Sequence, residues 1–161
     1  TLAKRAIAVA PWTPPSVTSI LTGLSVRRHG NSPDLMETHA KKKGQKLVDE
    51  IDTLAEILKS KGYQTAASSS NPWISETFNL DQGFDHFYYH KNSSTEVTLN
   101  AARQGLAKIS DSKDSPFFLY VHILDPHGPR TPSAEYAEMF KGKLEGRWPY
   151  SEEMQEDYHR I

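Results

Sequence analysis

TLAEILKSKGYQTAASS, residues 53–69, joins a helical pattern to a strand pattern through a single glycine. Three apolar side chains recur at the spacing of one helix face, namely Leu54, Ile57 and Leu58. Asp52 is a candidate N-cap for a helix that runs to Lys61, and Gly62 is the type of residue that commonly ends a helix in a left-handed conformation. We therefore expect a helix with that apolar face buried, followed by a strand over residues 63–69.

A second helix-to-strand unit lies further along the chain. Residues 95–109, TEVTLNAARQGLAKI, have a helical pattern, and residues 117–124, FFLYVHIL, form a continuous apolar run that is typical of a strand covered on both faces. The apolar residues 5–10, RAIAVA, predict a buried strand or a segment that leads into one, and the segments 71–75 and 81–90 are expected to be loops. Two such units predict an α/β/α sandwich with a mixed, largely parallel sheet.

The composition is that of a globular chain of about one domain. Its 161 residues are 37% hydrophobic, 24% charged and 10% aromatic. Nineteen basic against 20 acidic residues leave a net charge of −1, which does not favour nucleic acid or an anionic membrane as a partner. Cysteine is absent, which excludes disulfides, thiolate metal sites and a cysteine nucleophile. No apolar stretch approaches a transmembrane span, and the cellular compartment stays open.

The segment PWTPPS, residues 11–16, precedes a helical pattern whose apolar members are Val17, Ile20, Leu21 and Leu24. Thr13 is expected at the N-cap and Pro14 at the first helical position, with Gly23 as the stop. The same arrangement sets the Thr13 hydroxyl among unpaired backbone N–H groups at the positive end of a helix, a natural seat for sulfate or phosphate. Two interpretations are therefore open. Thr13 is either a cap, whose loss costs about 1 kcal/mol, or the nucleophile of an enzyme.

A second polar segment, DPHGPRTP at residues 125–132, follows the last predicted strand. Open α/β sheets bind ligands just beyond the carboxyl ends of their strands. His127 is therefore a candidate to contact an oxyanion or to give a proton to a leaving group, and the alternative is that Asp125 and His127 bond the loop backbone.

The other histidines and the basic stretch carry weaker expectations. His122, inside an apolar run, is expected to be a hydrogen-bonded core histidine. His86 and His90 have no third ligand nearby in the sequence, so a metal pair is not expected there. The polar, basic residues 25–46 are expected to form a surface loop.

Four segments, taken together, resemble the sulfatase family of the alkaline phosphatase superfamily. They are PWTPPSVTSILTGLSVRRHG (11–30), TLAEILKSKGYQTAA (53–67), LDQGFDHF (80–87) and PFFLYVHILDPHGPRTP (116–132). Their order and spacing cover most of the chain. The resemblance implies an alkaline-phosphatase-like fold, hydrolysis of small-molecule sulfate or phosphate esters, and a divalent metal ion such as Ca²⁺, Mg²⁺, Mn²⁺ or Zn²⁺.

Alignment with the family signature on Pro15 and Thr22-Gly23 places Thr13 at the nucleophile position and Val17 at the position of an arginine. The family converts a Cys or Ser there to formylglycine, so the resemblance excludes formylglycine at Thr13. Sister branches of the superfamily, including phosphodiesterases and phosphoethanolamine transferases, use threonine as a direct nucleophile on phosphorus. By the same resemblance, His127 matches a histidine that contacts the ester group.

In the family, the metal is held by paired aspartates on the first strand and by an Asp-His-Gly or Asp-Asn pair near the end of the catalytic domain. Neither segment occurs here. Residues 1–161 are therefore expected to be part of one catalytic domain that lacks both metal-binding segments, to keep Thr13 as a metal-facing residue, and to be inactive alone.

Three functions are open at this point. The first is a sulfatase-family hydrolase of sulfuric or phosphoric esters, metal-dependent when complete, with Thr13 and His127 as its catalytic residues. The second is a phosphodiesterase or phosphotransferase with Thr13 as direct nucleophile. The third is a non-catalytic binding module.

Overall fold

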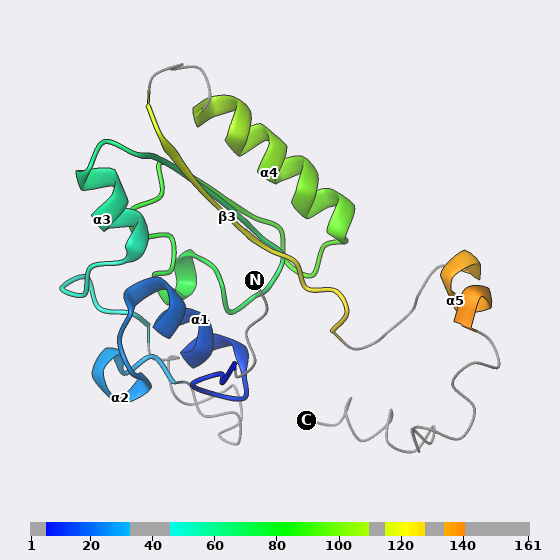
Figure 1. Ribbon diagram of the computed structural model, residues 1–161, viewed down its shortest axis with the longest axis horizontal. Coiled ribbons are helices and arrows are strands. Elements are labelled where there is room, and N and C mark those ends of the chain that lie inside the picture. Colours follow the sequence, from blue (N-terminus) through cyan, green and yellow to red (C-terminus); the bar gives the residue numbers. More distant parts are fainter. Residues whose placement is uncertain (1–5, 33–45, 110–114, 128–133, 141–161) are drawn as a thin grey trace. The chain divides into compact units, whose positions relative to one another are not determined.

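The computed structural model describes residues 6–32, 46–109, 115–127 and 134–140, and the chain divides into two compact units, Thr1–Leu124 and Asp125–Ile161 (Figure 1). The elements of the first unit are α1 (Thr13–Thr22), α2 (Val26–His29), α3 (Leu54–Ser60), β1 (Gln64–Ser69), the 3-10 helix η1 (Glu76–Phe78), β2 (His86–Tyr89), α4 (Thr95–Ile109) and β3 (Phe117–His122). In the second unit, residues 125–127 form a turn and α5 spans Ala134–Phe140. None of the helices in the described ranges is long and apolar enough to cross a membrane.

Three parallel strands form the sheet of the first unit, in the order β2-β1-β3. β1 lies in the centre, and all of its residues after Gln64 are buried. Ala66 lies opposite His86 on one side and Leu119 on the other. The predicted α/β class is confirmed. The strands expected over residues 63–69 and 117–124 are also confirmed, but β1 begins one residue later and β3 ends two residues earlier than expected.

Two expectations about strands are wrong. The segment 81–90 is not all loop, because His86–Tyr89 pair with β1 as β2. Residues 6–10 form no strand, and Ile7 is 83% exposed, because a strand needs a neighbour to take its backbone hydrogen bonds and the described sheet ends at β3. β3 is contacted by α4 on one face and by the cluster around Val17 and Leu21, through Tyr120, on the other, and it is a half-buried strand at the edge of the described sheet.

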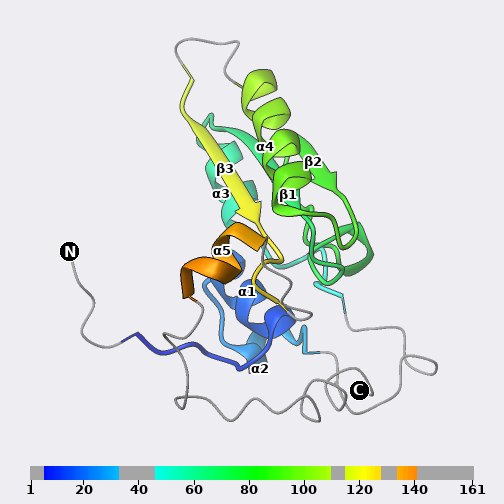
Figure 2. The ribbon, with the colours of Figure 1, turned by 90° about the vertical axis from the view of Figure 1, so that its right-hand side faces the viewer.

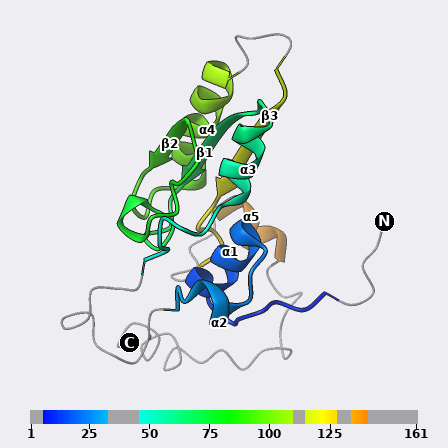
Figure 3. The same cartoon turned by 90° about the vertical axis from the view of Figure 1, so that its left-hand side faces the viewer.

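The side chains of β1 alternate between the two faces of the sheet, and different helices cover these faces (Figures 1 and 2). Ala66 and Ser68 face α4: a Cβ on Gly105 would lie 3.1 Å from the Ala66 Cβ, and the Ser68 hydroxyl donates to the Thr98 carbonyl (2.8 Å). Thr65 faces the side of α3. Figure 3 shows α1 next to α3, with α2 beside it. The first unit is thus a small α/β/α sandwich.

Helix α3 begins one residue later than predicted. Thr53, not Asp52, is its N-cap, because the Thr53 hydroxyl accepts from the Glu56 N–H while the Glu56 carboxylate accepts from the Thr53 N–H. The predicted buried face is also wrong: Ala55 is fully buried, whereas Leu54 and Ile57 are exposed. The expected stop at Gly62 is confirmed by its positive φ of 86°.

Helix α1 contributes to the core through Val17 and Leu21, which cluster with Leu47, Ile74 and Leu80, and Tyr120 of β3 packs against this cluster. Ile20, expected on the same stripe, is 64% exposed. Thr18 takes the inward position instead, because its hydroxyl accepts a hydrogen bond from the buried Asn31 amide (2.8 Å). Gly23 ends the helix in a left-handed conformation, as predicted.

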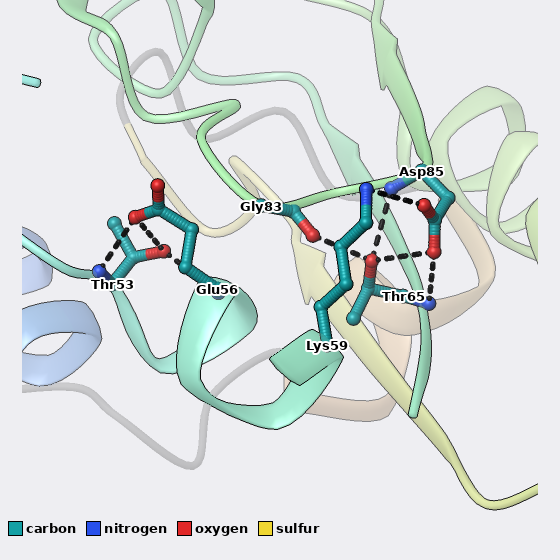
Figure 4. Close-up of polar contacts among 6 residues, drawn as sticks. All are labelled: Thr53, Glu56, Lys59, Thr65, Gly83 and Asp85. Atoms are coloured by element: carbon teal, nitrogen blue, oxygen red, sulfur yellow. Dashed lines mark hydrogen bonds and ion pairs between the residues drawn. The ribbon is translucent and has the colours of Figure 1, made fainter. Parts of the chain in front are cut away.

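Asp85 links β1 to α3, as Figure 4 shows. Its Oδ2 accepts from the Thr65 backbone N–H (3.0 Å), and its Oδ1 lies 2.6 Å from the Lys59 Nζ. Burial tends to raise the pKa of Asp85, but the hydrogen bonds from Lys59 and Thr65 and the charge of Lys59 outweigh it and lower the pKa below its ordinary value.

Replacing Asp85 with Ala is expected to lower the free energy of unfolding by about 1–3 kcal/mol, because the buried Thr65 N–H loses its acceptor. Lys59→Met is the matched control: it removes only a half-exposed ion pair and is expected to cost about 0–1 kcal/mol.

The lowered pKa makes the Asp85 contribution complete above the ordinary value of 3.8, and it is lost as the pH falls through the folded-state value. Urea unfolding at pH 7 and pH 3 measures both effects. Equal losses for the two variants would show that the Thr65 bond contributes little.

Candidate functional site

A shallow hollow of about 270 Å³ lies where the start of α1 meets the carboxyl end of β3. Its described lining belongs to the first unit and comes from the segment that enters α1, the first turns of α1, and one residue of β3: Ala10, Pro11, Trp12, Thr13, Ser16, Val17 and His122. This is the edge of a parallel sheet at which α/β proteins commonly bind ligands. The hollow brings Thr13 together with a histidine, but that histidine is His122.

Thr13 is not the N-cap of α1, which corrects the expectation from the sequence. Trp12 holds the cap position and makes no side-chain capping bond. A capping side chain accepts from the second or third backbone N–H of a helix, and here those positions are Pro14 and Pro15, which have none. The Ser16 N–H bonds to the Trp12 carbonyl (3.4 Å). The first turn therefore does not present the group of unpaired N–H donors expected there, and the Thr13 hydroxyl has no capping role.

The start of α1 is held against β3 by the core. Val17 is buried in the cluster on which Tyr120 packs, and it also lines the hollow. Its predicted role in packing is confirmed. On β3, Tyr120 lies opposite Ala67 and His122 opposite Ser69, two positions apart, so both side chains face the same side of the sheet.

His122 differs from the expected core histidine because it is half-buried and lines the hollow. Its Nδ1 lies 2.9 Å from the Tyr120 hydroxyl. Burial lowers the pKa of His122 and raises the pKa of Tyr120 to about 12, so the neutral imidazole and the protonated phenol are the favoured forms at neutral pH. The sequence did place His122 at the carboxyl end of a predicted strand, where α/β proteins bind ligands. The apolar residues around it favoured a core position instead.

His127 belongs to the second unit, where it lies in the exposed turn 125–127. Thr13 belongs to the first unit. The shared contact of Thr13 and His127 with one ester group stays a prediction.

The segment after α1 supports the helix and is not only a surface loop. His29, buried at the end of α2, lies 2.9 Å from the Ser19 hydroxyl through Nε2, and its Nδ1 accepts from the Asn31 N–H (3.1 Å). Burial lowers the pKa of His29, although a hydrogen bond to the Pro15 carbonyl opposes this. These contacts attach α2 to the side of α1 and so fix the helix that carries Thr13.

The described residues do not form a cation site. Within the described ranges, no three His, Asp or Glu side chains gather where they could hold a metal ion. His86 lies in β2 and His90 just after it, so they are not on one helix. Thr13 offers a hydroxyl but no neighbouring carboxylate among the residues that line the hollow. The metal ion that the resemblance implies does not fit these residues alone.

Comparisons with known proteins agree with the fold and with the resemblance to the sulfatase family. A scan against family models matches residues 1–147 to the family described as Sulfatase. A search of the curated proteins finds no significant match. Among solved structures, the chain is similar to one described as the structure of BT4656 in complex with its substrate, D-glucosamine-2-N,6-O-disulfate, with a TM-score of 0.65 and 24% identity. The match covers 88% of this chain but 30% of that chain, so the sequence spans less than a third of that protein's length.

Proposed function

Since the chain belongs to the sulfatase family, we propose that it is part of the catalytic domain of an enzyme that hydrolyses sulfuric or phosphoric esters of small molecules. One observation supports a location for the active site. Thr13, which has a hydroxyl and stands at the family's nucleophile position, lines a hollow at the carboxyl end of β3. The similarity to a structure that holds a sulfated sugar supports an ester of this type as the substrate.

Thr13 and His127 are the proposed catalytic residues. Thr13 meets the sulfuryl or phosphoryl group, and His127 contacts an ester oxygen at the turn that follows β3. The cation that the family resemblance implies would take its carboxylate ligands from parts of the protein beyond the described residues, with Thr13 facing it. These 161 residues are then expected to show no activity alone.

A second candidate follows from the identity of residue 13. A threonine cannot become formylglycine by the family's modification, but its hydroxyl can attack phosphorus directly. The Thr13 Oγ would form a bond to phosphorus as the bond to the alcohol leaving group breaks, and water would then cleave the phosphothreonine. The buried Val17, in place of the family's arginine, also favours an enzyme that differs from ordinary sulfatases.

The two candidates are separated by a substrate panel. The full-length protein is mixed with a divalent cation and with para-nitrophenyl sulfate, para-nitrophenyl phosphate or D-glucosamine-2-N,6-O-disulfate, and release of nitrophenolate or sulfate is measured. We expect turnover of at least one ester, and its loss when a chelator removes the cation. Turnover of sulfate alone would count against direct attack by Thr13. No turnover of any ester under these conditions would favour the non-catalytic binding module.

A further inference from the structure

We propose that His122 is a substrate-binding residue of this site, whose ring Nε2–H donates a hydrogen bond to a non-bridging oxygen of the sulfate or phosphate group beside Thr13. This inference rests on the proposed function, because it takes the hollow as the ester site. It adds a residue that neither the sequence motifs nor the family match assigns.

The backbone of His122 is held rigidly. Its carbonyl accepts from the Ser70 N–H (3.2 Å), and the Ser70 hydroxyl in turn accepts from the Leu124 N–H (3.0 Å). The strand register places His122 opposite the buried Ser69 at the last paired position of β3. The side chain therefore leaves the sheet at a fixed point on the face shared with Tyr120, and it forms one wall of the hollow.

The contact with Tyr120 bears on the tautomer of the ring, because either the phenol or the ring Nδ1 can donate across it. The Tyr120 phenol lies 2.9 Å from the His122 Nδ1 and keeps its proton at neutral pH, because burial raises its pKa to about 12. When this phenol donates to Nδ1, the neutral imidazole carries its own hydrogen on Nε2. The ring then presents a donor on the side away from Tyr120. The opposite tautomer would present a lone pair, which repels an anion.

The rest of the lining suits an anionic ligand. Among the described residues that line the hollow none carries a carboxylate, and the polar side chains other than His122 are the hydroxyls of Thr13 and Ser16 and the indole of Trp12. The Trp12 N–H is buried and has no acceptor among the described residues. Because that N–H is buried, it is not counted as a donor to a ligand in the hollow. The remaining described lining offers the two hydroxyls and His122 and no charged acceptor, which suits a tetrahedral oxyanion.

The test compares substitutions that keep or lose a donor at the Nε2 position. In His122→Gln the side-chain amide nitrogen reaches the place of Nε2, whereas in His122→Asn it reaches only the place of Nδ1. His122→Ala removes both, and Tyr120→Phe leaves the ring but frees its tautomer. For each full-length variant, calorimetry gives the dissociation constants of inorganic sulfate and phosphate, and ester assays give KM and kcat separately.

We expect His122→Ala and His122→Asn to weaken binding of the preferred anion by roughly ten- to hundredfold, the range for a hydrogen bond to a charged group. His122→Gln should recover most of this loss, and Tyr120→Phe should show an intermediate loss. KM should rise more than kcat falls. If His122→Ala fails to fold, as circular dichroism would show, the comparison of the Gln and Asn variants decides the question.

Unchanged anion binding in His122→Asn, or equal losses in the Gln and Asn variants, would overturn the inference. Ester turnover that is insensitive to His122 would overturn it and leave the proposed function standing. Anion binding that depends on His122 without turnover of any ester would support the binding role and count against the proposed hydrolase. Absence of anion binding in the unsubstituted protein would overturn the inference as well.

Discussion

Replacing Gly83 with Ala is expected to lower the free energy of unfolding by about 2–5 kcal/mol, a large part of the stability of a typical domain. Gly83 has a φ of 81°, which strains any residue with a Cβ. A Cβ there would collide with the Glu56 backbone nitrogen and lie 2.8 Å from the Ala55 carbonyl carbon. The loop cannot move away cheaply, because the Thr65 hydroxyl donates to the Gly83 carbonyl (2.6 Å; Figure 4).

Gly62→Ala is the matched control for this prediction. Its φ of 86° gives a similar backbone strain, but a Cβ at Gly62 would meet nothing within 4 Å. Urea unfolding of the two variants therefore separates the collision from the strain, and we expect Gly62→Ala to cost about 1–2 kcal/mol. Equal losses would show that the turn at Gly83 does not pack closely on α3.

Replacing Thr13 with Ala in the full-length protein is expected to lower kcat for the preferred ester on the order of 10³-fold or more, because the reaction loses its nucleophile or its contact with the transferred group. Stability should change by no more than about 0.5 kcal/mol, because the Thr13 hydroxyl makes no capping bond. This replaces the loss of about 1 kcal/mol expected from an N-cap. Steady-state kinetics and thermal unfolding of the same preparations measure the two quantities.

Two further variants at this position act as controls. Thr13→Ser keeps a hydroxyl and should keep much of the turnover, whereas Thr13→Val keeps the branched shape without the hydroxyl and should behave as Thr13→Ala. Turnover near the original rate in Thr13→Val would remove Thr13 from the chemistry. A stability loss of 1 kcal/mol or more in Thr13→Ala would instead point to a structural bond of its hydroxyl.

Residue patterns within one segment were sufficient to predict the helices and helix ends that depend on neighbouring residues alone. Residues 95–109 have both the spacing and the length of a helix, and α4 has the same bounds. Gly23 and Gly62 end their helices with positive φ, a conformation that glycine adopts at no steric cost because it has no Cβ. The family resemblance rested on the order of four segments along the chain, and the match over residues 1–147 confirms it.

Contacts between distant segments decided the rest. His86–Tyr89 form a strand because their backbone groups pair with the edge of β1. The residue types in this short segment do not indicate that such an edge lies beside them. Ala55 rather than Leu54 faces inward: Ala55 is fully buried, whereas Leu54 is 37% exposed. The turn at Gly83 packs on this part of α3, because a Cβ there would lie against the Glu56 nitrogen and the Ala55 carbonyl carbon.

The candidate site shows the same division. The residues around Thr13 predicted a helix start and left its role open between a cap and a nucleophile, and only the family resemblance placed it at a nucleophile position. The partner histidine in the hollow was not predicted, because His122 is more than a hundred residues away along the chain. It reaches Thr13 only through the register of β3 on β1 and the packing of Tyr120 against the core below α1. Both depend on hydrogen bonds and buried contacts between segments that are remote in sequence, which a local pattern of residue types does not contain.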